Sequence, residues 1–276
     1  MTAPTEQLPD VAPEPGAPPQ PQRGYAGGPE MTLVEHLLEL RNRVLISGIA
    51  VVVGMLVCLF FWQTIFGWLL APAREEFPDF RLSSFSPTDR IQMVFKIGIY
   101  GGFLLASPVV VYEMLAFIVP GLTPRERKAI FPGMIGATMF LLGGMAFAYW
   151  VILPASLGFL LDFGSEDIQN VIGIKQYMDF VLRVIFWVGI SFELPMVMAL
   201  LGWLGVVTAR QLLKFWRYAI VLCFVLAAIV TPTPDPLTQS LVGGPLIALY
   251  LLGIGMAWFT GRRHRRVRPE ALPGVG

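Results

Sequence analysis

The hexapeptide Ile190-Ser191-Phe192-Glu193-Leu194-Pro195 lies inside an apolar run that extends from Val184 to Ala209. As a helix with a rise of 1.5 Å per residue, this run is long enough to span a bilayer, and Glu193 lies about 15 Å along it, near the midplane. A carboxylate is costly in lipid, so a chain that keeps one there uses it for an interior partner or a pathway. The hexapeptide therefore predicts a membrane protein with a polar function inside the membrane.

The composition of the whole chain agrees with several membrane crossings. Of the 276 residues, 55% are hydrophobic and 14% are charged, which favours a polytopic membrane protein over a globular one. Residues 1–30 are polar and rich in proline, and we expect a disordered tail there. We expect a transmembrane domain over residues 31–261 and a basic cytoplasmic tail over residues 262–276. Cys58 and Cys223 each stand alone in an apolar run, which favours small buried side chains over a disulfide or metal site.

Six apolar segments are candidates for membrane-spanning helices by their length and hydropathy. They are Val44–Leu70, Ile97–Val119, Ala129–Leu161, Val184–Leu204, Tyr218–Val230 and Leu241–Thr260. The fifth is marginal, because its helix would be about 20 Å long against a hydrocarbon core of about 30 Å. The sequence therefore predicts an all-α membrane protein with six transmembrane helices.

The distribution of lysine and arginine predicts the orientation of these helices. Basic residues gather before the first segment, between the second and third, between the fourth and fifth, and after the sixth. They are Arg23, Arg41, Arg43, Arg125, Arg127, Lys128, Arg210, Lys214, Arg217, Arg262, Arg263, Arg265, Arg266 and Arg268. Because cytoplasmic segments carry the excess of basic residues, we expect both termini in the cytoplasm, which agrees with an even number of spans.

The sequence contains none of the common catalytic or nucleotide-binding motifs. A zinc-type His-Glu-x-x-His, a Walker Gly-x-x-x-x-Gly-Lys and a Gly-x-Ser-x-Gly elbow are all absent. The His36 and Glu39 side chains have a spacing that fits one helix face, but without a third ligand in view they do not predict a metal site. The pair Gly98 and Gly102 has the spacing of a helix-packing face, although a single copy is weak evidence.

The stretch Met31–Leu45 has the pattern of an amphipathic helix lying in the cytoplasmic interface before the first span. In a simpler alternative, Glu39 pairs with Arg43 at i,i+4 on a solvated face. A second carboxylate, Glu126, lies on the same side of the membrane among Arg125, Arg127 and Lys128. Two such carboxylates could accept a pair of guanidinium groups through forked hydrogen bonds, a geometry that lysine does not reproduce.

Seven motifs, in this order along the chain, resemble the C subunit of the twin-arginine protein translocase, the TatC family. They are His36–Arg43, Ser107–Tyr112, Phe117–Leu122, Glu126–Lys128, Gly144–Tyr149, Ser191–Pro195, and Thr231–Asp235 with Gln239. The resemblance covers about residues 31 to 262 and leaves out the N-terminal tail and most of the basic tail. It implies six helices in a concave, glove-like arrangement in the bacterial inner membrane.

The resemblance also implies a function and its residues. The expected function is that of a signal-peptide receptor and core membrane component, which exports folded proteins with twin-arginine signal peptides and is driven by the proton-motive force. Such a protein is not an enzyme and needs no cofactor or metal. The implied signal-peptide site comprises Glu39, Arg41, Phe117, Glu126 and Arg127.

Further partners follow from the same resemblance. Glu193 and Gln239 are the implied intramembrane polar positions, with Glu193 docking small single-span subunits of the TatA/TatB type. The implied partners are these subunits, the signal peptides and the lipid bilayer, in an oligomeric complex without nucleic acid.

The sequence departs from the family pattern at two positions, and it leaves a second class of function open. Glu113 stands where the family usually has Gln, and Leu115 where Trp is common; we expect Glu113 to lie near the cytoplasmic end and reach headgroup water. The alternative function is a proton-coupled transporter of small solutes, with Glu113 and Glu193 as relay groups. The two halves of the chain show no convincing repeat, which disfavours a transporter, and the missing catalytic constellation disfavours an intramembrane protease.

Overall fold

The computed structural model describes residues 33–77, 80–118, 130–162, 171–203, 205–231 and 235–266. The expected N-terminal tail over residues 1–30 therefore lies outside the described residues, as do Glu126 and Arg127. Of the expected basic tail, only the backbone as far as Arg266 is described, as the end of a helix.

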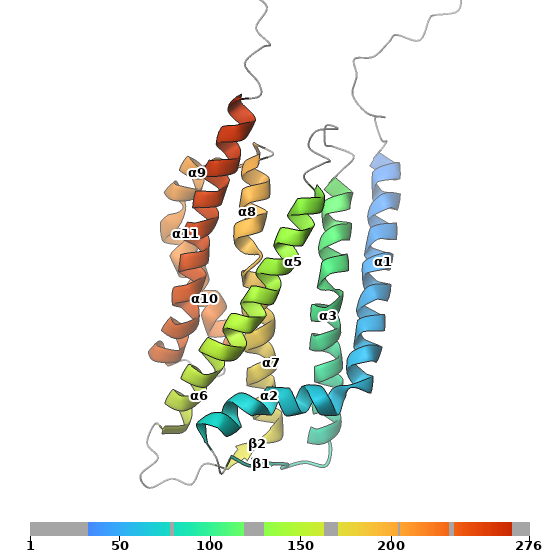
Figure 1. Cartoon of the computed structure of the whole chain (residues 1–276), viewed down its shortest axis with the longest axis vertical. Helices are drawn as coiled ribbons and strands as arrows, with labels where there is room; N and C mark the ends of the chain where they lie inside the picture. Colours follow the sequence, from blue (N-terminus) through green and yellow to red (C-terminus); the bar gives the residue numbers. More distant parts are fainter. Residues whose placement is uncertain are drawn as a thin grey trace, which may run out of the picture.

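The described residues form helices and two very short strands (Figure 1). The long apolar helices are α1 (Leu33–Phe60), α3 (Asp89–Ile118), α5 (Ile130–Phe147) with its π-helical and α6 continuations (Ala148–Ile152, Leu153–Asp162), α7 (Ile174–Ser191) with α8 (Leu194–Trp203), and α11 (Pro236–Arg266). The shorter elements are α2 (Trp62–Glu76), β1 (Leu82–Ser83), β2 (Ile172–Gly173), α9 (Ala209–Lys214) and α10 (Trp216–Val230).

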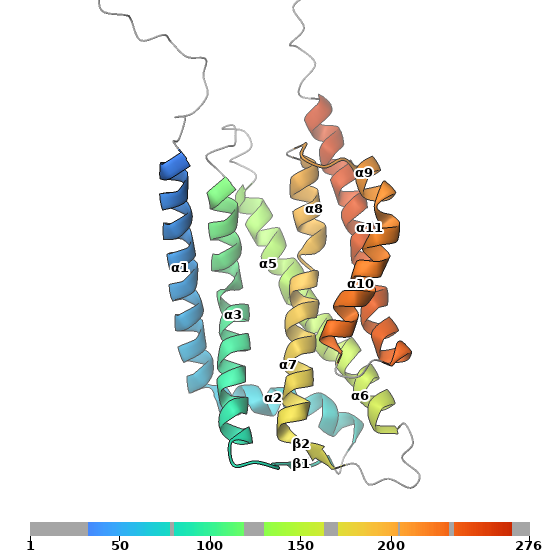
Figure 2. The same cartoon turned by 180° about the vertical axis from the view of Figure 1, so that it is seen from behind.

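Five of these helical units are long and apolar enough to cross a membrane, and they match five of the six predicted spans. The remaining prediction, Tyr218–Val230, corresponds to α10, which has only 15 residues. A helix of that length is about 22 Å long, shorter than the hydrocarbon core. From behind, α10 lies beside α11 and α7 rather than standing apart (Figure 2).

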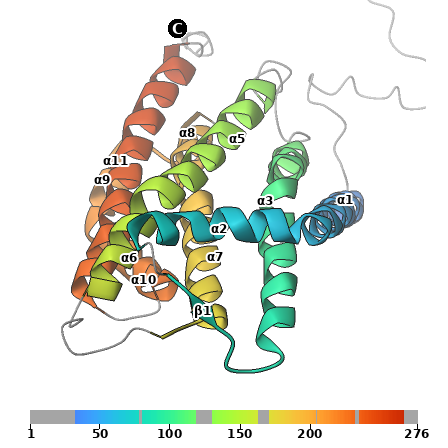
Figure 3. The ribbon, with the colours of Figure 1, turned by 60° about the horizontal axis from the view of Figure 1, so that its bottom comes forward.

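Two predictions about the first span are wrong. The expected span Val44–Leu70 ends ten residues early, because α1 stops at Phe60 and α2 then crosses the end of the bundle (Figure 3). The separate interfacial helix over Met31–Leu45 does not exist within the described residues, since α1 runs unbroken from Leu33 into the span. No proline or glycine interrupts the chain there before Gly48, so the amphipathic turn simply continues the helix.

Two tyrosine hydroxyls hold α2 in its transverse position. Pro72 has no N–H, so the carbonyl of Trp68 lacks its helical donor, and the Tyr149 hydroxyl donates to it at 2.8 Å. The Tyr177 hydroxyl donates to the next carbonyl, that of Leu69, at 2.7 Å. We call these two contacts the tyrosine clamp. They connect α2 to two helical units that follow it by about 80 and 110 residues.

Helix α7 lies at the centre of the core. Its side chains Met178, Val181, Val184 and Val188 are almost completely buried. Toward the end of the bundle that carries α2, Lys96 of α3 forms an ion pair with Asp179 of α7. In the same region β1 and β2 pair in parallel and join the chain after α2 to the start of α7.

Glycines allow α1 and α3 to approach each other closely. A Cβ on Gly102 would lie 2.5 Å from the backbone nitrogen of Met55, and a Cβ on Gly54 would lie 2.6 Å from the carbonyl oxygen of Gly102. Gly98 faces the side chain of Leu59 in the same way. The suggested packing face at Gly98 and Gly102 is therefore confirmed, and it is the main support of α1, which packs chiefly against α3.

Candidate functional site

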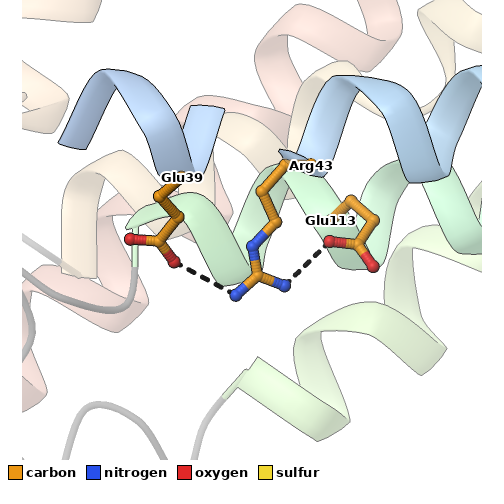
Figure 4. Close-up of polar contacts among 3 residues, drawn as sticks. All are labelled: Glu39, Arg43 and Glu113. Atoms are coloured by element: carbon orange, nitrogen blue, oxygen red, sulfur yellow. Dashed lines mark hydrogen bonds and ion pairs between the residues drawn. The ribbon is translucent and has the colours of Figure 1, made fainter. Parts of the chain in front are cut away.

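A charged cluster connects α1 and α3 about three turns from the N-terminus of α1. The Arg43 guanidinium lies between two carboxylates, as Figure 4 shows. Its Nη2 donates to Oε1 of Glu39 at 3.1 Å, and its Nη1 donates to Oε2 of Glu113 at 2.8 Å. We call these three residues the Arg43 bridge. The i,i+4 spacing brings Glu39 to Arg43 on one helix, whereas Glu113 reaches them only because α1 and α3 pack closely.

The bridge is sheltered from solvent. Glu113 is only 6% exposed, so the expectation that it reaches headgroup water is wrong. The expected i,i+4 pairing of Glu39 with Arg43 is confirmed, but the pair is not on a fully solvated face, because the two side chains are only 20% and 28% exposed. In such a setting a carboxylate needs a close partner, because desolvation of an unpaired charge costs several kcal/mol.

One oxygen of Glu39 remains without a donor. Its Oε2 is buried and has no hydrogen-bond partner among the described residues, while its Oε1 accepts from Arg43. A carboxylate accepts several hydrogen bonds, and buried oxygens are rarely left unpaired. The bridge can therefore accept a further N–H donor at this atom.

An aromatic pair lies beside the bridge. The rings of His36 and Phe117 stack with centroids 4.4 Å apart and planes inclined by 21°. His36 precedes Glu39 by one turn on α1, and Phe117 follows Glu113 by one turn on α3, so the stack and the bridge are successive contacts between the same two helices. Phe117 and Glu39, both predicted as site residues, are thus brought together.

The other predicted signal-site residues are placed differently. Arg41 is exposed, and among the described side chains its guanidinium contacts only that of the neighbouring Asn42, at 3.4 Å. Its position on α1 points it away from the face that carries Glu39 and Arg43. Glu126 and Arg127 belong to the connection between α3 and α5, which lies outside the described residues.

Glu193 lies where the helix breaks between α7 and α8. The N–H of Glu193 donates to the carbonyl of Ile190, three residues back, and regular helix resumes at Leu194. Pro195 removes the donor that the Ser191 carbonyl would otherwise receive, which accounts for the interruption of the helix between Ser191 and Leu194. The Glu193 side chain is half-buried, and within the described chain no donor contacts its carboxyl.

Gln239 has a partner inside the molecule. Its side-chain nitrogen donates to the carbonyl of Phe224 at 3.0 Å, which connects α11 to α10. A second hydrogen bond connects α11 to α9, because the Tyr250 hydroxyl donates to the carbonyl of Leu212 at 2.7 Å. The predicted docking role of Gln239 stays a prediction, and its amide also fastens the short helix α10 to its neighbour.

Sequence reasoning missed Arg43 and Glu113 as members of the site. The departure from Gln at position 113 was visible, and so was the spacing of Glu39 and Arg43. The sequence did not reveal the register in which α1 packs against α3, and this register depends on the close approach at the glycines at positions 54, 98 and 102. The available signal was an acidic residue within one predicted span, Glu113, and an arginine next to another, Arg43, which could pair across the two helices.

Comparison with known proteins gives a consistent result. A family model described as Sec-independent protein translocase protein (TatC) matches residues 35–245. Curated proteins with this description include one from Synechocystis sp., 38% identical over 84% of this chain and 90% of its own length, and one from Aquifex aeolicus, 36% identical over 86% and 99%. A chloroplastic relative from Arabidopsis thaliana is 40% identical over 84% of this chain and 68% of its own.

A solved structure is similar as well. It is described as the crystal structure of the twin-arginine translocase receptor TatC, and it shares 37% sequence identity with this chain. The TM-score is 0.75, with 82% of this chain and 99% of the solved chain covered.

Proposed function

Because this chain belongs to the TatC family and is the core receptor component of the twin-arginine translocase, we propose that its signal-binding site is built around the Arg43 bridge. The chain is a multi-pass membrane protein of twin-arginine protein translocation and not an enzyme. In this site Glu39 and Glu126 bind the paired arginines of a signal peptide. Phe117, Arg41 and Arg127 form the surrounding surface.

The observation that carries the proposal is the orphan Oε2 of Glu39 beside an internal guanidinium. Arg43 already lies between two carboxylates, so this environment suits a planar cation with several N–H donors. A signal arginine could donate to the orphan oxygen without breaking the bridge, or could replace Arg43 on Glu39. Both routes use charge-assisted hydrogen bonds, which are shorter and stronger than neutral ones.

Signal-peptide crosslinking to the membrane-embedded protein tests this site. We expect a twin-arginine peptide to label the native protein strongly. The double variant Glu39→Ala, Glu126→Ala should be labelled at least about tenfold less, because hydrogen bonds to charged groups contribute about 1.5–3 kcal/mol each. A Lys-Lys peptide should label both proteins weakly. The matched control is Glu75→Ala, which removes an exposed carboxylate of α2 at the opposite end of the bundle. Equal labelling of both proteins by both peptides would disprove the proposal.

We propose that the protein lies in a bacterial plasma membrane with both termini on the cytoplasmic side. The start of α1 and the end of α11 lie at the same end of the bundle (Figure 1), which supports an even number of crossings with α10 as the short one. We propose that the helices form the concave, glove-like wall that the sequence resemblance implies. Export of folded substrates is then driven by the proton-motive force.

We further propose that Glu193 docks small single-span subunits of the TatA/TatB type in an oligomeric complex. The half-buried carboxyl at a helix break, with no donor among the described residues, supports this role. A partner helix that brings a polar side chain would satisfy it, and intramembrane polar groups normally find such partners.

Replacing Glu193 tests the docking role. We expect Glu193→Ala to reduce co-purification of the single-span subunits several-fold while signal-peptide crosslinking persists, because the bridge lies on other helices. Glu193→Gln should keep most of the association, since the amide still donates and accepts hydrogen bonds. Unchanged association in the alanine variant would show that Glu193 does not dock these subunits.

A further inference from the structure

Side chains of α2 line a pocket of about 540 Å³. Helix α2 lies at the end of the bundle opposite the start of α1, which carries the Arg43 bridge (Figure 1). The walls of the pocket come from α2, from the chain between α2 and α3, and from the first turns of α3 and α7. Three of the lining residues are arginines: Arg74, Arg81 and Arg90. The rest of the lining includes aromatic and apolar side chains such as Trp62, Phe66 and Met93.

The charged side chains that line this pocket are all positive. They are the three arginines, and none of the nearby described carboxylates is among the lining residues. One of these carboxylates, Asp89 in the first turn of α3, accepts at its Oδ2 from the backbone N–H groups of Phe85 and Ser86 in the loop that precedes the helix. Among the residues that the structure describes, no carboxylate forms an ion pair with any of the three guanidinium groups. Within the described part of the chain, the pocket therefore has an excess of positive charge with no counter-ion.

The pocket lies at the level expected for lipid headgroups. Trp68 of α2 and Trp150, which follows α5, are 68% and 73% exposed in this part of the bundle. Exposed tryptophans concentrate where hydrocarbon meets the headgroups. Helix α2 crosses the end of the bundle beside them, as an interfacial helix does (Figure 3). With both termini in the cytoplasm, as proposed above, this end faces outward, and we expect the arginines of the pocket at the level of the phosphates of the outward leaflet.

We propose that this pocket binds an anionic phospholipid of the outward leaflet, with its phosphate on Arg74, Arg81 and Arg90 and an acyl chain over Trp62 and Phe66. Guanidinium groups bind phosphate through paired hydrogen bonds, which suits three arginines that have no carboxylate partner among the described residues. A free phosphate would meet the same charges but would leave the aromatic wall in contact with water. The lipid uses both halves of the lining, and it would stabilise α2 against α3 independently of signal-peptide binding.

Lipid binding by the full-length protein in neutral detergent tests this inference. The probes are phosphatidylglycerol, phosphatidylcholine and inorganic phosphate, with retained lipid counted by native mass spectrometry. We expect saturable retention of phosphatidylglycerol, at least tenfold weaker retention of phosphatidylcholine, and no competition by millimolar phosphate. The variant Arg74→Gln, Arg81→Gln, Arg90→Gln should lose the preference, and Lys175→Gln, which removes an exposed cation at the same end, should keep it.

Two results would overturn the inference. One is equal retention of both lipids by the native protein; the other is competition by inorganic phosphate, which would identify a simple anion site. If the triple variant fails to fold, photo-crosslinking decides with native protein alone. Phosphatidylglycerol with a diazirine on its acyl chain should label peptides of α2 and early α3, and labelling confined to other helices would contradict the proposal. Signal-peptide crosslinking measured in parallel separates this result from the receptor proposal.

Discussion

Replacing Arg43 with methionine is expected to lower the free energy of unfolding by about 3 kcal/mol, because it leaves Glu113 buried without its cation. The measurement is reversible unfolding in mixed micelles, followed by circular dichroism. The double variant Arg43→Met, Glu113→Leu should recover most of this loss, since two apolar side chains of similar size replace a buried ion pair at little net cost.

Two further variants test whether the effect on the free energy of unfolding comes from the charge of the bridge. Glu113→Gln should be milder than Arg43→Met, because the amide oxygen still accepts from the guanidinium and Glu39 still balances its charge. The matched control is Arg41→Met, which removes a neighbouring exposed arginine of the same helix and should change the free energy of unfolding by less than about 1 kcal/mol. Similar losses for Arg41→Met and Arg43→Met would contradict the buried bridge.

Replacing Gly102 with leucine is expected to separate α1 from α3. The new Cβ would lie 2.5 Å from the Met55 nitrogen, and that contact involves backbone, which cannot turn aside. Overpacking of this kind costs about 1–3 kcal/mol, and here it also removes the register that brings Glu113 to Arg43. We therefore expect the variant to lose both stability and signal-peptide crosslinking, measured as for the native protein.

A leucine at Gly48 provides the control for that experiment. A Cβ at Gly48 meets nothing within 4 Å, although it lies on α1 only two turns from Gly54. Gly48→Leu changes the helix propensity in the same direction as Gly102→Leu, so it isolates the effect of the close approach. Equal behaviour of the two variants would show that the glycine contact does not position α1.

The spans could be predicted from the sequence because hydropathy and charge are local properties of each segment. Five long apolar helices overlap the expected spans, although the first begins and ends about ten residues earlier than expected, and the short fifth span was visible as a short run of residues. The end of α1 at Phe60 could not be predicted in this way, because no proline or glycine marks it. The transverse course of α2 depends on donors from Tyr149 and Tyr177, which lie far away in the sequence.

The candidate site was only partly predictable for the same physical reason. Glu39 and Phe117 were assigned through motifs, and the structure brings them to the same helix pair. The role of Glu113 was misjudged because distance along a helix was used as a measure of depth. Its actual burial depends on how closely α1 approaches, and that approach is determined by small residues on both helices.

The tyrosine clamp has a consequence for the order in which the molecule is assembled. The Trp68 carbonyl has no donor in its own helix, and its partner Tyr149 is synthesised about 80 residues later; Tyr177 follows later still. A nascent chain that ends before these tyrosines has an α2 that is not yet fastened to the bundle. We therefore expect α2 to be fully fastened only late in biogenesis, and protease resistance of α2 would report that the helices as far as α7 have come together.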